Sequence, residues 1–139
     1  LMAAPRPDLA EAAAERAVFR NVGHAAATIR NEAIESIEPA AGPSPPGTPP
    51  HTHTTGITRK GKVRRGELPR AIVFDQDRDA QSALIGPRYS VVGESGAAHE
   101  GTLGGEFKGD EYPERPFMGP TLDNNNDRFA SSFAGSIGE

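Results

Sequence analysis

Residues 8–38 read DLAEAAAERAVFRNVGHAAATIRNEAIESIE, and this stretch decides the fold because its apolar residues recur with helical spacing. It predicts one amphipathic helix, about 45 Å long at ~1.5 Å per residue. Asp8 has Glu11 three residues after it, which predicts an N-cap with a capping box. Gly23 predicts a bend or a close crossing by another segment, and Pro39 should end the helix. The expected apolar stripe is Leu9, Val18, Phe19, Val22, Ala26, Ile29, Ala33, Ile34 and Ile37.

A proline-rich segment follows, in which six of the twelve residues 39–50 are proline. Proline fixes φ, lacks a backbone donor and is excluded from helix interiors and central strands. We therefore expect an extended arm of about 37 Å, at ~3.1 Å per residue in the polyproline II conformation. Residues 39–67 are interpreted as this arm and a basic loop. The contacts to other subunits or to DNA are expected at Pro49, Pro50, His51, His53, Arg59, Lys60, Lys62, Arg64 and Arg65.

The rest of the chain predicts a small sheet and a second helix. Residues 68–92 are expected to form an antiparallel meander of about three to four strands, because short apolar runs alternate there with polar turns. Residues 93–119 are expected to form a loop, and residues 120–137 a short C-terminal helix that starts at a proline. The three apolar runs are residues 68–75, 80–86 and 89–92.

These elements predict a single α+β domain covering residues 1–139, with the long N-terminal helix packed on the sheet and an extended Pro-rich arm. Leu, Ile, Val and Phe together make up 18% of the residues, just under the usual floor for a self-sufficient globular chain. The net charge of −4 is too small to favour disorder. We therefore expect a folded chain with a small core, whose apolar surface is completed in part by neighbouring subunits.

Several classes of protein are excluded by composition. The chain contains no Cys, which excludes disulfides, thiolate catalysis and Cys-ligated zinc. No apolar run approaches the length of a membrane span, and no hydrophobic signal region precedes the first helix. A protein that folds in the cytoplasm and has no membrane partner is expected.

Charge is distributed unevenly along the chain. Residues 58–70 contain six basic side chains and one acidic one, whereas residues 94–139 contain three basic and nine acidic ones. This favours head-to-tail contact between copies, or a surface with two faces of opposite sign. The simpler alternative is a solvated loop beside a solvated surface. The basic loop could also contact DNA phosphates without sequence specificity, although it has no aromatic residue to stack on bases.

Three motifs have a possible chemical reading, and each has a simpler structural one. GESGA at residues 93–97 resembles a nucleophile elbow, but it ends in Ala where that pattern has Gly, and the chain is short for that hydrolase fold. His51 and His53 could hold a metal, but no third ligand is indicated. The glycines of residues 101–109 lack the spacing of a nucleotide-binding loop. No enzymatic activity, catalytic residue, cofactor or metal is therefore expected.

Three stretches, taken in order after the first helix, together resemble the small neck proteins of long-tailed bacteriophages, which include head–tail joining, tail-completion and minor tail components. A polar insert at residues 57–62 and a longer loop at residues 101–107 depart from the usual pattern of that family. The stretches are GTPPHTHTTG at residues 47–56, IGPRY at residues 85–89 with AHE at residues 98–100, and YPERPFMGPTL at residues 112–122.

The resemblance implies a virion structural protein without catalysis, forming a ring of about six or twelve copies at the junction of capsid portal and tail. Its partners would be itself, adjacent neck, portal-adaptor and tail proteins, and packaged DNA through non-specific contact. It would assemble in the host cytoplasm and reside in the virion neck. The alternative is a small DNA-associated protein that uses residues 58–70. The expected structural motif is a turn at His99 and Glu100, and a rigid start to the last helix at Arg115, Pro116, Phe117 and Met118.

Overall fold

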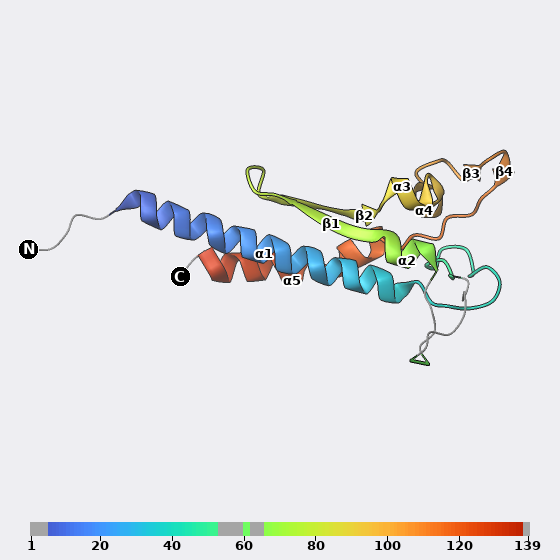
Figure 1. Ribbon diagram of the computed structural model, residues 1–139, viewed down its shortest axis with the longest axis horizontal. Helices are drawn as coiled ribbons and strands as arrows, with labels where there is room; N and C mark the ends of the chain where they lie inside the picture. Colours follow the sequence, from blue (N-terminus) through green and yellow to red (C-terminus); the bar gives the residue numbers. More distant parts are fainter. Residues whose placement is uncertain (1–5, 53–59, 62–65, 138–139) are drawn as a thin grey trace, which may run out of the picture.

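The computed structural model describes residues 6–52, 60–61 and 66–137, and Figure 1 shows the arrangement of its elements. The long helix α1 runs along the molecule, the β1–β2 hairpin lies along one side of it, and α5 lies along another side. This confirms the α+β fold, with a long N-terminal helix, antiparallel strands and a C-terminal helix. The elements are α1 (Pro7–Ser36), α2 (Glu67–Ala71), β1 (Ile72–Asp77), β2 (Ser82–Pro87), α3 (Tyr89–Val92), α4 (Ser95–Glu100), β3 (Glu106–Phe107), β4 (Asp110–Glu111) and α5 (Gly119–Ile137).

The first turn of α1 differs from the expected capping box. Arg6 is the N-cap residue, no side chain caps the helix, and Asp8 instead bonds the Arg6 guanidinium at 3.1 Å. The reason is Pro7, whose fixed φ suits the first helical position, so the helix begins one residue earlier and Asp8 lies inside its first turn. A carboxylate there still interacts favourably with the helix dipole.

Gly23 lies where another segment crosses α1 closely. The sequence predicted either a bend or a close crossing at this residue. A Cβ atom at this position would lie 2.7 Å from Oε1 of Gln76 on β1. The Gln76 side-chain amide donates a 2.9 Å hydrogen bond to the Phe19 carbonyl on α1. The close crossing is confirmed, and a larger residue at this position would require the Gln76 side chain to move.

The main sheet has two strands instead of a three- or four-stranded meander. β1 pairs antiparallel with β2, with Phe74 opposite Ile85. The first apolar run is divided between α2 and β1, so the strand starts at Ile72. Residues 89–92, expected as a third strand, form α3, because the amides of Val91 and Val92 bond the carbonyl of Arg88 locally at 3.1 and 3.2 Å. A run of four apolar residues does not distinguish a strand from a helical turn.

Residues 93–119, expected to form a loop, contain a helical turn and a second hairpin. α4 ends at Gly101, which takes a left-handed φ of 88° and serves as its C-cap. β3 and β4 then pair antiparallel in a separate two-stranded sheet. The sequence did not predict these elements, because each is six residues or shorter and too short to show a periodic pattern among the polar and Gly residues around it.

The core lies against the C-terminal half of α1. Its central cluster consists of Ala33 from α1, Ile37 at the C-cap of α1, Ile72 from β1 and Phe117 from the segment before α5. Ala26 and Ile29 are also buried, so this part of the expected apolar stripe is confirmed. The stripe does not hold at the N-terminal end, where Leu9 is 56% exposed. Figure 1 shows that this end of α1 extends past the other elements.

The proline-rich segment folds back on the body of the chain, which corrects the extended arm expected for it. Its two ends meet, because Pro39 and Thr52 form a β-bridge and the Thr52 amide donates to the Glu38 carbonyl at 2.9 Å. Gly42 and Gly47 both have positive φ and allow the chain to reverse, whereas proline restricts only its own φ. Residues 39–52 therefore form a closed loop, and no reach of about 37 Å is available from them.

Among the helices of the described residues, none is long and apolar enough to cross a membrane.

Candidate interaction surfaces

The Glu100 side chain links the end of α4 to the start of α5. Its Oε1 accepts hydrogen bonds from the backbone amides of Phe117, at 2.7 Å, and Met118, and its Oε2 accepts one from Gly119 at 3.3 Å. The first amides of a helix have no partner within the helix, and a negative charge there is favoured by the helix dipole. Glu100 therefore caps α5 from a separate element, and this holds two distant segments together.

The turn formed by Arg115 and Pro116 places the next residues against the core. Phe117 is fully buried, Met118 packs against the core cluster, and Thr121 donates back to the Phe117 carbonyl at 3.0 Å. Arg115 donates its backbone amide to the His99 carbonyl at 2.7 Å. The six residues expected to form a structural motif therefore lie together in the structure.

His99 lies between this turn and the β3–β4 hairpin. Its Nε2 is 3.2 Å from the Tyr112 hydroxyl, and the two rings are 5.2 Å apart. Burial lowers the pKa of His99 below 6.5, and the nearby Arg115 cation lowers this pKa further, whereas Glu100 opposes the shift. His99 is thus held as a neutral imidazole at neutral pH. Its buried Nδ1 has no hydrogen-bond partner among the residues that the structure describes.

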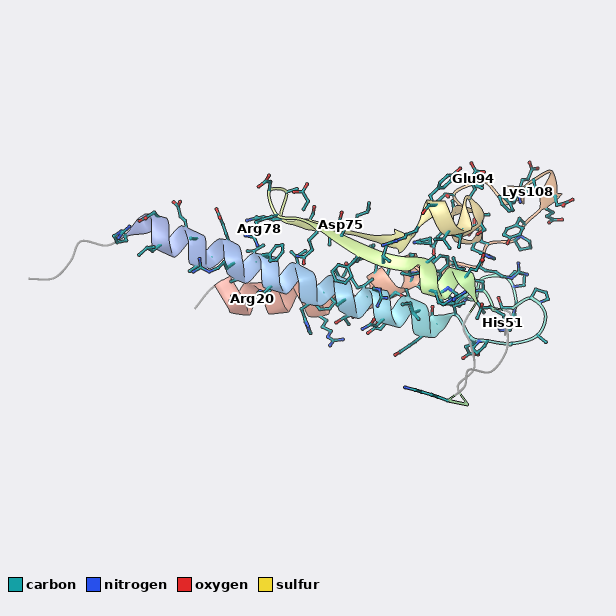
Figure 2. The ribbon with its side chains drawn as sticks, viewed as in Figure 1. Arg20, His51, Asp75, Arg78, Glu94 and Lys108 are labelled. Carbon is teal, nitrogen blue, oxygen red and sulfur yellow. The ribbon has the colours of Figure 1, made fainter. Side chains whose placement is uncertain are left out.

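The closed loop of residues 39–52 is attached to the same region. Arg115 Nε donates to the Ser44 carbonyl at 2.8 Å, and the Gly47 amide donates to the Glu114 carbonyl at 2.8 Å. Pro50 is fully buried, while Pro49 and His51 are partly exposed, and His51 Nδ1 lies 3.3 Å from the Gly42 carbonyl. Figure 2 shows His51 on this loop, beside the C-terminal end of α1.

The stretches that carry the family resemblance meet in space where they are described. The IGPRY stretch reaches α4 through Pro87, whose Cγ would lie 2.6 Å from a Cβ atom placed on Gly96. Glu100 of AHE bonds to Phe117 of YPERPFMGPTL, and Gly47, the first residue of GTPPHTHTTG, bonds to Glu114. These motifs, which are separate in the sequence, form one packed unit at the end of the molecule opposite the N-terminus (Figure 1).

A cavity of about 880 Å³ lies between this loop and the short helices, lined among others by Ser44, Ser95, His99 and Arg115. The Ser95 hydroxyl donates to the Val92 carbonyl at 2.9 Å and serves as a local turn contact. No Ser95–His99 hydrogen bond occurs in the described part of the chain, so the geometry of a base-activated nucleophile is missing there. Among the described residues, no group of three or more His, Asp or Glu side chains could hold a metal ion.

Most of the basic loop lies outside the residues that the structure describes: His53, Arg59, Lys62, Arg64 and Arg65. Among the Lys and Arg residues expected to make these contacts, Lys60 is the one that the structure describes, and it is exposed. Contact of these residues with DNA or with another subunit therefore stays a prediction.

An uncovered surface lies on the outer side of the main hairpin, and the sequence-based reasoning missed it. Leu84 on β2 is 82% exposed, and Val91 on α3 is 48% exposed. Val91 is part of the lining of a groove of about 480 Å³, which also includes Val73, Arg70 and Arg88. The signal for it was present in the sequence, since adjacent apolar residues such as Val73 and Phe74 point to opposite faces of a strand.

The β3–β4 hairpin carries negative charge, opposite to that of Arg70 and Arg88 at the groove. Glu106, Asp110 and Glu111 are exposed on it, against one exposed cation, Lys108. The hairpin lies at the far end of the molecule, where Figure 2 labels Lys108. No ion pair involves these side chains, or Arg70 and Arg88, within the described residues.

No protein-family model, no curated protein and no solved structure matches the chain. A function is therefore inferred from the geometry described above.

Proposed function

We propose that this chain is a structural subunit of a ring at the head–tail junction of a long-tailed bacteriophage, where it joins the capsid portal complex to the tail. The observation that carries the proposal is the uncovered outer face of the β1–β2 hairpin, where Leu84 is 82% exposed. Leu84 stands there among the exposed polar residues Asp75, Asp77 and Ser82. The two-stranded sheet also has two strand edges without a further strand, and such edges can pair with another chain. A neighbouring subunit would cover this face and these edges.

The motif cluster around Glu100 supports the same proposal. The three stretches that resemble phage neck proteins pack together through Glu100, Arg115 and the closed loop, so they act as one structural unit. A unit held by backbone hydrogen bonds and a buried Phe117 suits a scaffold role, because it fixes geometry without presenting reactive groups.

The charge layout favours a ring over a symmetric dimer. The cations Arg70 and Arg88 and the acidic β3–β4 hairpin occupy different parts of one subunit. Head-to-tail contacts between unlike surfaces generate rings when the rotation closes. The neck layer in which such a ring would lie (adaptor, stopper, tail completion or terminator) stays open.

The experiment is to locate the chain in virions and to remove it. With the chain carrying a small tag, cryo-electron microscopy should place six or twelve copies at the neck. Particles made without it should contain filled heads and tails that fail to join, and supplying the untagged chain should restore joining. Label along the tail shaft or across the capsid shell, or normal joining without the chain, would contradict the proposal.

A further inference from the structure

We propose that the groove between α2, β1 and α3 binds the acidic β3–β4 hairpin of a second copy of this chain. The groove has a volume of about 480 Å³, and its lining includes the apolar side chains of Ala71, Val73 and Val91. The exposed residues Arg70 and Arg88 also line the groove, with Glu67 as the one acidic residue in its lining. The inference rests on the proposed function, since it names the contact that would join subunits in the ring.

Charge complementarity identifies the occupant. The hairpin presents three exposed carboxylates against one lysine, and the groove presents two arginines against one glutamate. None of these side chains has an ion-pair partner among the described residues of its own chain. Opposite charges on two such surfaces steer association and set its register.

The apolar parts of the two surfaces also match. Val91 is 48% exposed at the groove, and Leu103, in the turn before β3, is 38% exposed. Docking would remove both side chains from water, and this burial of apolar surface favours association. This burial supplies affinity, whereas ion pairs that stay exposed to water contribute little on their own.

The hairpin of a given chain cannot fill its own groove. The Tyr112 amide bonds the Gly105 carbonyl at 2.7 Å, and the Phe107 and Tyr112 rings pack 5.4 Å apart, so the base of the hairpin is fixed beside His99. In Figure 1, α4 lies between the β3–β4 hairpin and α3, which supplies Val91 to the groove. The contact is therefore between copies. Because its two surfaces differ, each subunit binds one neighbour through its groove and another neighbour through its β3–β4 hairpin.

Charge reversal tests this contact directly. The groove variant carries Arg70→Glu and Arg88→Glu, and the hairpin variant carries Asp110→Lys and Glu111→Lys. Each variant alone should lose the wild-type oligomer in light scattering and native mass spectrometry, because its two surfaces repel. Mixed in equal amounts, the two variants should form an oligomer of the wild-type size with alternating subunits, because both contacts are again complementary. This rescue also shows that each variant is folded.

The matched control reverses two exposed arginines on α1, Arg16→Glu and Arg20→Glu, and should keep the wild-type oligomer. The inference would be overturned by a groove variant that assembles like the wild type, by a mixture that stays monomeric, or by a wild-type chain that is monomeric at every concentration. A second test uses the absence of Cys in the chain. With dissolved oxygen as the oxidant and copper–phenanthroline as the catalyst, Val91→Cys together with Lys108→Cys should form disulfides that cross-link copies into a ladder, whereas Val91→Cys alone should not.

These results separate the two proposals. A ring at the virion neck that ignores the charge reversals would refute the groove contact and leave the proposed function standing. Assembly that follows the charge reversals, in a protein absent from the neck, would refute the proposed function and leave the groove contact standing.

Discussion

Glu100 and Phe117 are seventeen residues apart, and the Glu100 carboxylate accepts a 2.7 Å hydrogen bond from the Phe117 backbone amide. The same carboxylate accepts hydrogen bonds from the next two amides, so a side chain of α4 serves as the cap of α5. Because Phe117 is completely buried, the cap and the core depend on each other. The stability of the fold should therefore respond strongly to changes at this one surface-facing turn.

Replacing Glu100 tests this coupling. Glu100→Ala should lower the free energy of unfolding by about 2 kcal/mol, because it leaves the first amides of α5 without a partner and removes a charge that the helix dipole favours. Glu100→Gln keeps an acceptor oxygen and should lose about 1 kcal/mol. Urea unfolding measures both. The control is the exposed Glu94→Ala, at the N-terminus of α4, which should change the free energy by less than about 0.5 kcal/mol.

Gly101 should tolerate substitution less well than Gly104. Both have positive φ, at 88° and 74°, so alanine at either position should cost about 1–2 kcal/mol. At Gly101 the new Cβ would also collide with the Glu114 side chain, whereas nothing lies within 4 Å at Gly104. Gly101→Ala should therefore be about 1 kcal/mol more destabilising than Gly104→Ala in thermal unfolding. Equal losses would show that Glu114 moves aside freely.

Arg115→Met should loosen the closed loop of residues 39–52. It removes the 2.8 Å bond to the Ser44 carbonyl and keeps most of the apolar stem. Hydrogen exchange at the Gly47 and Thr52 amides should then be about tenfold faster, since one hydrogen bond from a charged donor contributes roughly 1.5 kcal/mol. Arg128→Met on α5 is the control, because it leaves the loop contacts in place. Unchanged exchange at Gly47 would mean that proline stiffness alone holds the loop.

Stability should depend on pH through His99. Its pKa in the folded protein is below the ordinary value of 6.5, so the unfolded chain binds more protons in the interval between these two values. Stability should therefore rise with pH across that interval and fall as the pH drops below 6.5. In His99→Gln, urea midpoints at a series of pH values should lose this contribution to the slope. An identical slope in the variant would show that His99 does not take up a proton on unfolding.

Much of the fold was predictable because it depends on local patterns. The helices expected at residues 8–38 and 120–137 occur as Pro7–Ser36 and Gly119–Ile137, since long apolar periodicity and nearby prolines specify them. The short elements were predicted less well. Residues 89–92 form a helical turn instead of a strand, because hydrogen bonds to Arg88 decide a run too short to show a period.

The candidate surfaces were predictable only in part. The sequence marked His99, Glu100 and Arg115 to Met118 as motifs, but their contacts join residues as far as 71 positions apart and involve backbone amides and carbonyls that carry no sequence signal. The groove at Arg88 and Val91 was not foreseen, since it forms only when α2, β1 and α3 come together.

Residue pattern alone determines that this is an α+β chain with a long helix, a small core, no Cys and opposite charges in two regions, because composition and periodicity act over short distances. Tertiary structure decided the course of the proline-rich segment. Each proline limits its own φ, yet Gly42, Gly47 and the bonds from Thr52 and Arg115 bring the segment back onto the body. Contacts between residues far apart in the sequence decide whether this segment is an extended arm or a closed loop. Rules that use only local sequence therefore do not predict its course.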